Sequence, residues 1–201
     1  MINRIVQAFS LSLLILAAAI PARAAGGDPA AATVQGFYDA LVASMKSGGT
    51  TKSRYEKLKP AVEQAFDIPG MTALSVGPSW SSASPADQKS LIEAFERMTI
   101  ANYARNFDSY DGEKFTVDPT VIDRGSDKLV KSTLKPSSGD AIPFNYRLHQ
   151  ADGGWKIVDI YLNGNISQLA QKRSDFGATL QASGPQGLVK KINALADQTL
   201  G

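Results

Sequence analysis

Four short strand-like segments joined by tight turns constrain the fold of this 201-residue chain more than any other feature. The three connections between them are rich in Gly, Ser and Asp, which are typical turn residues. Connections this short join antiparallel neighbours, so the sequence predicts a four-stranded antiparallel meander. The segments span residues 115–122, 128–135, 141–149 and 155–162.

The last two segments differ in how they distribute their apolar residues. In the third, Ile142, Phe144, Tyr146 and Leu148 alternate with other residues and therefore share one face. The fourth, residues 155–162, is apolar on both faces near its end. A strand of this kind indicates a covered central position or the wall of a cavity.

Helical patterns precede and follow the strands, and this segregated order predicts the α+β class, with N- and C-terminal helices flanking the meander. Pro60 predicts a kink or break in the second helix. Asn165 is expected to cap the first helix after the strands, and Gly184-Pro185 separates it from a last helix. The expected helices before the strands cover residues 31–46, 51–66, a short apolar piece ending at 76, and 84–110.

The helix over residues 84–110 has the clearest signals. Ser84 is a suitable N-cap and Pro85 suits the first helical position. About 26 helical residues would extend nearly 40 Å. One stripe of this helix is strongly aromatic and includes Phe95, Tyr103 and Phe107.

The N-terminus has the features of a secretory signal. Arg4 precedes an apolar run over residues 5–20, and the small-x-small sequence at 22–24 predicts cleavage after Ala24. The run is short for a membrane span, which needs about 20 apolar residues, although an uncleaved anchor is the alternative. Residues 1–24 are therefore expected to be a signal peptide and residues 25–201 a single exported, periplasmic domain. The absence of cysteine excludes a lipoprotein and leaves stability to an ordinary core.

Charge argues against a nucleic-acid-binding function. Two of the 21 basic residues lie in the leader, which leaves 19 basic against 19 acidic residues. One local excess of Lys and Arg lies between Lys46 and Lys59. It is either a solvated helix face or a docking patch for anionic headgroups.

The sequence lacks the residues of the common catalytic sites. It has no cysteine, no Gly-x-Ser-x-Gly elbow, and no phosphate-binding glycine loop. His149 is its only histidine, and a solvated side chain is the simplest expectation for it. We therefore expect no enzyme activity, no cofactor and no metal.

One enzymatic alternative is an isomerase or dehydratase of the cone-shaped α+β type, with an Asp and a Tyr inside the cone. Asp159 and Tyr161 are the candidates, with Tyr146 on the neighbouring strand. Strand periodicity would place Asp159 on the same face as Ile157 and Tyr161.

Several short motifs follow one another in a fixed order along the chain. Phe66-Asp67 is followed by Met71, Gly77 and Trp80, and the long helix ends in Tyr103-Ala104 and Tyr-Asp-Gly-Glu at 110–113. The last part contains Gly-Trp-Lys-Ile-Val-Asp at 154–159, Asn-Gly-Asn-Ile-Ser at 163–167 and Lys-Arg-Ser-Asp-Phe at 172–176. From Thr33 to Leu200 the chain resembles the MlaC family, periplasmic lipid-shuttle proteins also called toluene-tolerance auxiliary proteins.

Two departures from the family pattern bear on the cargo. The 163–167 stretch is one residue longer than the usual Glu-Gly-Val-Ser, and Val76-Gly77 stands where Leu-Gly is usual. The longer stretch looks more like the hopanoid-associated branch, HpnM. The resemblance thus implies either a hopanoid or a phospholipid as ligand.

The resemblance implies an NTF2-like/MlaC-like fold with an apolar cavity between sheet and helices. It also implies a lipid carrier between the inner and outer membranes, with an inner-membrane lipid transporter and an outer-membrane complex as partners. We expect a monomer. The alternative is an interaction module with a filled core. The residues expected to bind lipid are Phe95, Met98, Tyr103 and Phe107 on one wall, Phe144, Tyr146, Ile157 and Tyr161 opposite, and Ile166, Leu169 and Phe176 at the floor or rim.

Overall fold

The structure is a computed structural model, and it describes residues 27–151 and 153–201. The expected signal peptide and its cleavage site therefore lie outside the described residues. No helix in the described ranges is both long and apolar enough to cross a membrane.

The predicted meander is confirmed as a single antiparallel sheet in the order β1-β2-β3-β4-β5. The fifth strand was not predicted: two residues after the β4 turn add briefly to the edge of β4. The strands are β1 (Lys114–Arg124), β2 (Asp127–Lys135), β3 (Ile142–Ala151), β4 (Gly154–Leu162) and β5 (Ile166–Ser167).

The helices agree with the expected order, and most of them begin at a side-chain cap. Asp28, Thr50, Asp67 and Ser84 each accept a hydrogen bond from a backbone N–H in the first turn of the helix they precede. The helices are α1 (Pro29–Lys46), α2 (Thr51–Ala65), α3 (Ile68–Val76), α4 (Pro85–Asn106) and α5 (Gln168–Leu200), with a 3₁₀ turn, η1 (Gly77–Trp80), before α4.

Two features of the helices before the sheet differ from the expectation: α2 is not broken at Pro60, and α4 is shorter. The α2 helix continues through Pro60, whose exposed ring faces away from the core. The carbonyl of Glu56, which loses its partner there, belongs to an exposed residue that water can reach. The α4 helix ends at Asn106 rather than near Tyr110, because Phe107 leaves the helical conformation and packs between Tyr103 and Phe115 of β1.

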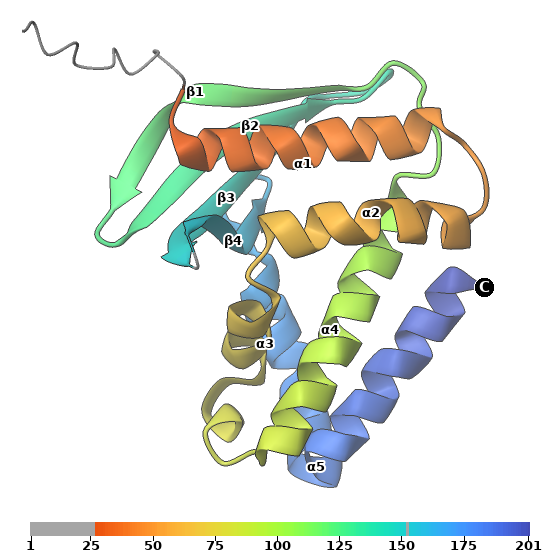
Figure 1. Cartoon of the computed structure of the whole chain (residues 1–201), viewed down its shortest axis with the longest axis vertical. Helices are drawn as coiled ribbons and strands as arrows, with labels where there is room; N and C mark the ends of the chain where they lie inside the picture. The colour runs from red at the N-terminus through yellow and green to blue at the C-terminus, as the bar shows by residue number, and fades with distance from the viewer. Residues whose placement is uncertain (1–26, 152) are drawn as a thin grey trace, which may run out of the picture.

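The start of α5 also differs from the prediction. Ser167, not Asn165, caps this helix by accepting from the Ala170 N–H at 3.0 Å. The predicted interruption is present: Gly184 has φ 64° and ψ −169°, so the chain reverses there and the second half of α5 runs back beside α4 (Figure 1).

The α1 helix lies along one face of the sheet, with α2 beside it (Figure 1). Val34, Phe37, Tyr38 and Leu41 are buried between this helix and its neighbours. Asp28, at the start of α1, forms an ion pair with Lys128 of β2 at 2.5 Å. Burial acts to raise the pKa of Asp28, but the ammonium of Lys128 and the Ala30 N–H outweigh it and hold that pKa below its ordinary value.

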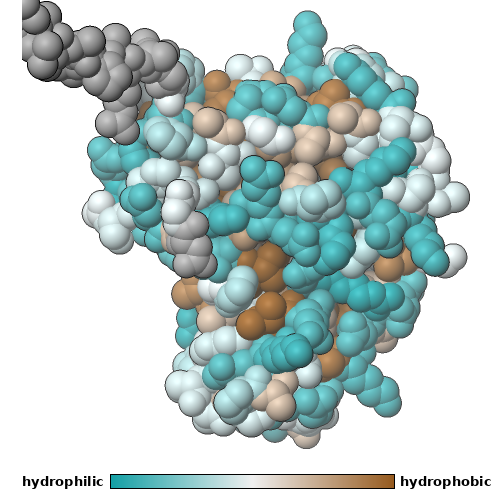
Figure 2. All heavy atoms as spheres, viewed as in Figure 1, coloured by the Kyte–Doolittle hydropathy of each residue, from teal (hydrophilic) through white to brown (hydrophobic). Residues whose placement is uncertain are grey.

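The remaining helices, α3, α4 and α5, form the lower half of the molecule in Figure 1. Figure 2 shows that hydrophobic residues gather where this half meets α2, while most of the visible surface is hydrophilic. The junction between the two halves is therefore the region in which to look for a ligand site.

Candidate functional site

A cavity of about 500 Å³ lies between α4, the start of β3, the end of β4, and the first turns of α5. Its size falls within the range of about 300–1,000 Å³ that is usual for ligand pockets. We call it the main pocket. Its walls are mostly apolar: Met71, Phe95, Met98, Tyr103, Phe107, Phe144, Ile160, Leu162 and Leu169, with Thr99, Asn102, Asn106, Gln168 and Lys172 as the polar members.

The structure brings six of the eleven residues expected to bind lipid into the wall of this pocket. They come from three separate parts of the chain, because β3 and the first turns of α5 converge on α4. The six are Phe95, Met98, Tyr103, Phe107, Phe144 and Leu169.

Tyr146 lies deeper, beside a small cavity of about 20 Å³ that shares Tyr103, Phe107 and Phe144 with the main pocket. At its end the hydroxyls of Tyr38 and Ser132 lie 2.6 Å apart, and Ser132 donates to the carbonyl of Phe144. Burial raises the pKa of the Tyr38, Tyr103 and Tyr146 phenols. All three therefore stay neutral at ordinary pH, and the inner end of the pocket carries hydroxyl groups but no charge.

Three of the expected residues lie elsewhere. Ile157 is fully buried in the core, and Phe176 packs edge-to-face against Phe95 with ring centroids 6.4 Å apart. Ile166 is 40% exposed on β5. Phe176 supports Phe95 from behind the wall, whereas Ile157 and Ile166 line neither cavity.

Tyr161 is the last of the eleven residues expected to bind lipid. It was expected to face the cavity, and this prediction was wrong. In β4 the register shifts: Leu148 pairs with Ile157, but Arg147 pairs with Asp159, which leaves Val158 as an extra residue. A bulge of one residue reverses the faces of everything that follows it. Ile160 and Leu162 thus face the pocket with Tyr146 and Phe144, while Asp159 and Tyr161 point to the other side.

The same bulge contradicts the proposed catalytic group of Asp159, Tyr161 and Tyr146. The Asp159 carboxylate instead accepts hydrogen bonds from the Ile160 N–H at 2.7 Å, the Leu169 N–H at 3.2 Å and the Ser167 hydroxyl at 2.6 Å. It holds the start of α5 against β4. Asp159 is therefore a structural residue rather than an acid–base group that faces the pocket.

Sequence reasoning missed part of the pocket wall. Ile160 and Leu162 were assigned to the wrong face because a bulge leaves no periodic signal. Asn102 and Asn106 fall on the stripe of α4 that the sequence predicted to face a cavity. Thr99, Gln168 and Lys172 were not predicted, although Gln168 and Lys172 are spaced by four residues along α5.

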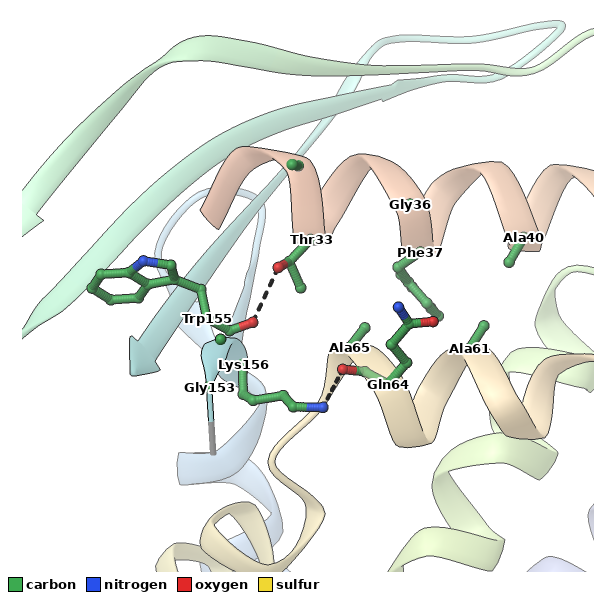
Figure 3. A pocket seen from close by; sticks show the side chains of 12 residues that line it. Thr33, Gly36, Phe37, Ala40, Ala61, Gln64, Ala65, Gly153, Trp155 and Lys156 are labelled. Carbon is green, nitrogen blue, oxygen red and sulfur yellow. Dashed lines mark hydrogen bonds between the residues drawn. The ribbon is translucent and has the colours of Figure 1, made fainter. Parts of the chain in front are cut away.

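A second cavity, of about 460 Å³, lies between α1, α2 and the start of β4. It is lined mainly by alanine and glycine, and none of the expected lipid-binding residues contributes to it. Figure 3 shows the two polar contacts at its end: the Thr33 hydroxyl donates to the Trp155 carbonyl at 3.0 Å, and the Lys156 ammonium donates to the Gln64 carbonyl. These polar groups are engaged in holding α1, α2 and β4 together.

The basic segment between Lys46 and Lys59 is largely occupied by internal contacts. Arg54 is buried and donates to the carbonyls of Ala104 and Gly49 at 2.8 and 2.6 Å. Lys59 contacts both Glu63 and Glu96 at 2.6 Å, and these hydrogen bonds raise its pKa. Lys46 lies 4.6 Å from the ring centroid of Tyr110. The contacts favour a structural role over the alternative docking patch.

Metal ligation has no support in the part of the chain that the structure describes, since no group of three or more His, Cys, Asp or Glu side chains converges there.

Three comparisons relate the chain to known proteins. The chain is 26% identical to the toluene tolerance protein ttg2D of Pseudomonas putida over 193 residues, covering 92% of this chain and 88% of that protein. The fold matches a phospholipid-binding protein from Ralstonia solanacearum, solved in complex with a phospholipid, with a TM-score of 0.76 and 22% identity over 87% of this chain and 100% of that one. The family model described as MlaC protein matches residues 32–194. The chain therefore belongs to the MlaC family.

Proposed function

We propose that this protein is a periplasmic lipid carrier that holds the hydrocarbon part of a lipid in the main pocket. The observation that carries the proposal is the apolar wall of that pocket, to which α4, β3, β4 and α5 all contribute. The lining includes no aspartate, glutamate, histidine or cysteine, and its few polar side chains are outnumbered by apolar ones. Binding without chemistry is the function that such a lining supports best.

The physical need for a carrier follows from the hydrophobic effect. Exposing hydrocarbon to water costs about 0.8 kcal/mol per methylene, so a lipid with some thirty methylenes faces a barrier on the order of 20 kcal/mol in water. Apolar side chains such as Phe95, Met98 and Leu162 replace that water contact.

The relatives supply the context of the proposal. The Ralstonia protein is described as binding a phospholipid, and the Pseudomonas protein as a toluene tolerance protein. By analogy we propose a phospholipid or a hopanoid as cargo, export through a cleaved signal peptide, and shuttling of a monomer between an inner-membrane lipid transporter and an outer-membrane complex.

The test is native mass spectrometry with organic extraction on protein purified from its own periplasm. A bound lipid is expected, and its mass separates phospholipid from hopanoid. Protein that is lipid-free both from its native periplasm and after incubation with lipid vesicles would contradict the proposal.

Two neighbouring residues on β4 offer a matched pair of variants. Leu162→Asp places a charge in the pocket and should abolish lipid loading, because the buried carboxylate would lose its water. Tyr161→Asp makes the same change one residue away on the opposite face and should load normally. Circular dichroism of both variants checks that each is folded, and equal loading of the two would exclude the main pocket as the lipid site.

A further inference from the structure

One face of the sheet is left uncovered by the helices. Within the described residues, no helix other than α1 packs extensively against β1, β2 or β3 (Figure 1). The strand register separates the two faces. The cross-strand pairs Val130–Tyr146 and Ser132–Phe144 lie toward α1, since Tyr38 of α1 contacts both Tyr146 and Ser132. Alternate positions therefore point away from α1, and we call this outward side of β1–β3 the open face.

The open face carries an excess of basic side chains. Lys114 and Lys135 lie opposite each other at one end, Lys131 follows along β2, and Arg124 lies at the other end of β1. All four side chains are exposed. Outside residues 1–24 the chain has equal numbers of basic and acidic residues, so the excess is a local asymmetry of charge. We call these four residues the basic cluster.

The charge of the basic cluster is largely uncompensated by the protein. Within the described ranges, none of its four members forms an ion pair. Two acids lie beside them and both have other contacts: Asp127 lies 3.3 Å from the guanidinium of Arg147, and Asp118 accepts from the Thr120 N–H at 2.8 Å. Lys59 of α2 shows the contrast, because it contacts two glutamates.

The four residues are spread along the open face and do not meet at one point. Lys114 and Arg124 begin and end β1, and at about 3.3 Å per residue they are roughly 30 Å apart. No member of the cluster lines any of the cavities found in the described residues. The half-buried side chains of Ile122 and Leu129 lie among them. This arrangement suits a broad anionic surface better than a small anionic ligand.

The composition of the open face favours a bilayer over a protein as that surface. Protein interfaces depend on aromatic and arginine anchors that fill pockets. The outward positions of β1–β3 include no Phe, Tyr or Trp. Basic side chains on a flat surface bind anionic headgroups by charge alone, and each adds about fivefold to the affinity. The flexible stem of lysine also lets its ammonium reach headgroups at different depths.

We propose that the open face docks on an anionic phospholipid bilayer through the basic cluster. The main pocket lies on the other side of the sheet, where Phe144 and Ile160 line it. A protein docked in this way stays at the membrane with its pocket turned away from the bilayer. The inference goes beyond the proposed function, since it concerns a surface that the pocket does not use.

The test is co-sedimentation with lipid vesicles, using protein purified from its own periplasm. One set of vesicles is dioleoylphosphatidylcholine alone, and the other is an equal mixture with dioleoylphosphatidylglycerol. We expect binding to the anionic vesicles only. Raising NaCl to about 1 M should release the protein, because the Debye length falls to about 3 Å.

Two double variants with the same change in charge locate the surface. Lys114→Gln with Lys131→Gln should weaken binding to anionic vesicles about 25-fold, at about fivefold for each lysine. Lys89→Gln with Lys190→Gln removes two exposed lysines from α4 and α5, away from the open face, and should bind as wild type. Equal affinities of the two double variants would overturn the proposal. Retention of wild type on immobilised polyglutamate without binding to anionic vesicles would also overturn it and would assign the open face to an acidic protein.

The lipid content of the same preparations, measured by native mass spectrometry, separates this inference from the carrier function. Protein that carries lipid but does not bind anionic vesicles would overturn the docking surface alone. Protein that binds anionic vesicles, and that stays lipid-free even after incubation with them, would overturn the carrier function and support the docking surface.

Discussion

The buried carboxylate of Asp159 connects three backbone segments at the edge of the main pocket. It accepts from Ile160 in β4, from Ser167 in β5 and from Leu169 in α5. Ser167 in turn accepts from the Ala170 N–H and caps α5. One side chain thus positions both Ile160 and Leu169, which line the pocket.

Replacing Asp159 with alanine should lower the free energy of unfolding by about 3 kcal/mol, because the Leu169 N–H and its neighbours lose their acceptor in a buried position. Urea denaturation measures the change. Glu93→Ala, which removes only a solvent-exposed contact with Lys89 at 3.9 Å, is the control and should change stability by less than about 0.5 kcal/mol. A loss of less than about 1 kcal/mol in Asp159→Ala would mean that water replaces the carboxylate.

At the scale of the element, one short irregularity places a pocket wall, and a second one packs a helix against α4. The Val158 bulge turns Ile160 and Leu162 toward α4, and the reversal at Gly184 brings the second half of α5 back beside α4. Buried side chains hold that second half in place, including Leu188 and Ile192. If β4 were regular, Asp159 and Tyr161 would face the pocket in place of Ile160 and Leu162.

The reversal in α5 depends on a glycine. Gly184 adopts a positive φ that side chains disfavour, so Gly184→Ala should destabilise the protein by about 1–3 kcal/mol. Gly177→Ala is the matched control, since it lies in the regular part of the same helix with no atom within 4 Å of the added Cβ. That control should stabilise by about 0.5–1 kcal/mol. Thermal or urea unfolding measures the change in the free energy of unfolding for each variant. Stabilisation by both substitutions would contradict the role of Gly184.

At the scale of the whole molecule, the main pocket lies where the two halves meet, so a bound lipid contacts both. The α4 helix belongs to one half and the sheet to the other, and Phe144 and Phe107 come from opposite sides of the pocket. A ligand bound in this pocket should therefore stabilise both halves against unfolding.

Removal of the lipid should therefore lower the thermal stability of the entire protein. At a free ligand concentration one hundred times the Kd, binding contributes about 2.7 kcal/mol. For a domain of this size the loss corresponds to a fall in Tm of about 5–10 °C. Differential scanning calorimetry of lipid-loaded and delipidated protein measures it. Leu162→Asp, which should load no lipid, serves as the control, and its Tm should not change on delipidation.

The sequence by itself determined the elements and their order. Tight turns rich in Gly, Ser and Asp allowed only an antiparallel meander, Ser84-Pro85 marked the start of α4, and Gly184-Pro185 marked the break in α5. The aromatic stripe of α4 predicted Phe95, Tyr103 and Phe107 as neighbours of one cavity, because helical periodicity is a local property of the chain.

Only the tertiary structure decided which residues the cavity contains. A single extra residue, Val158, turned Ile160 and Leu162 toward the cavity in place of Asp159 and Tyr161. No local pattern predicts this bulge, because it arises from pairing with β3. The polar part of the lining likewise depends on the approach of α5 to α4, which brings Asn102 and Lys172 into one pocket although they are 70 positions apart in sequence. Periodicity assigns a residue to a face, but the packing of distant segments determines what that face meets.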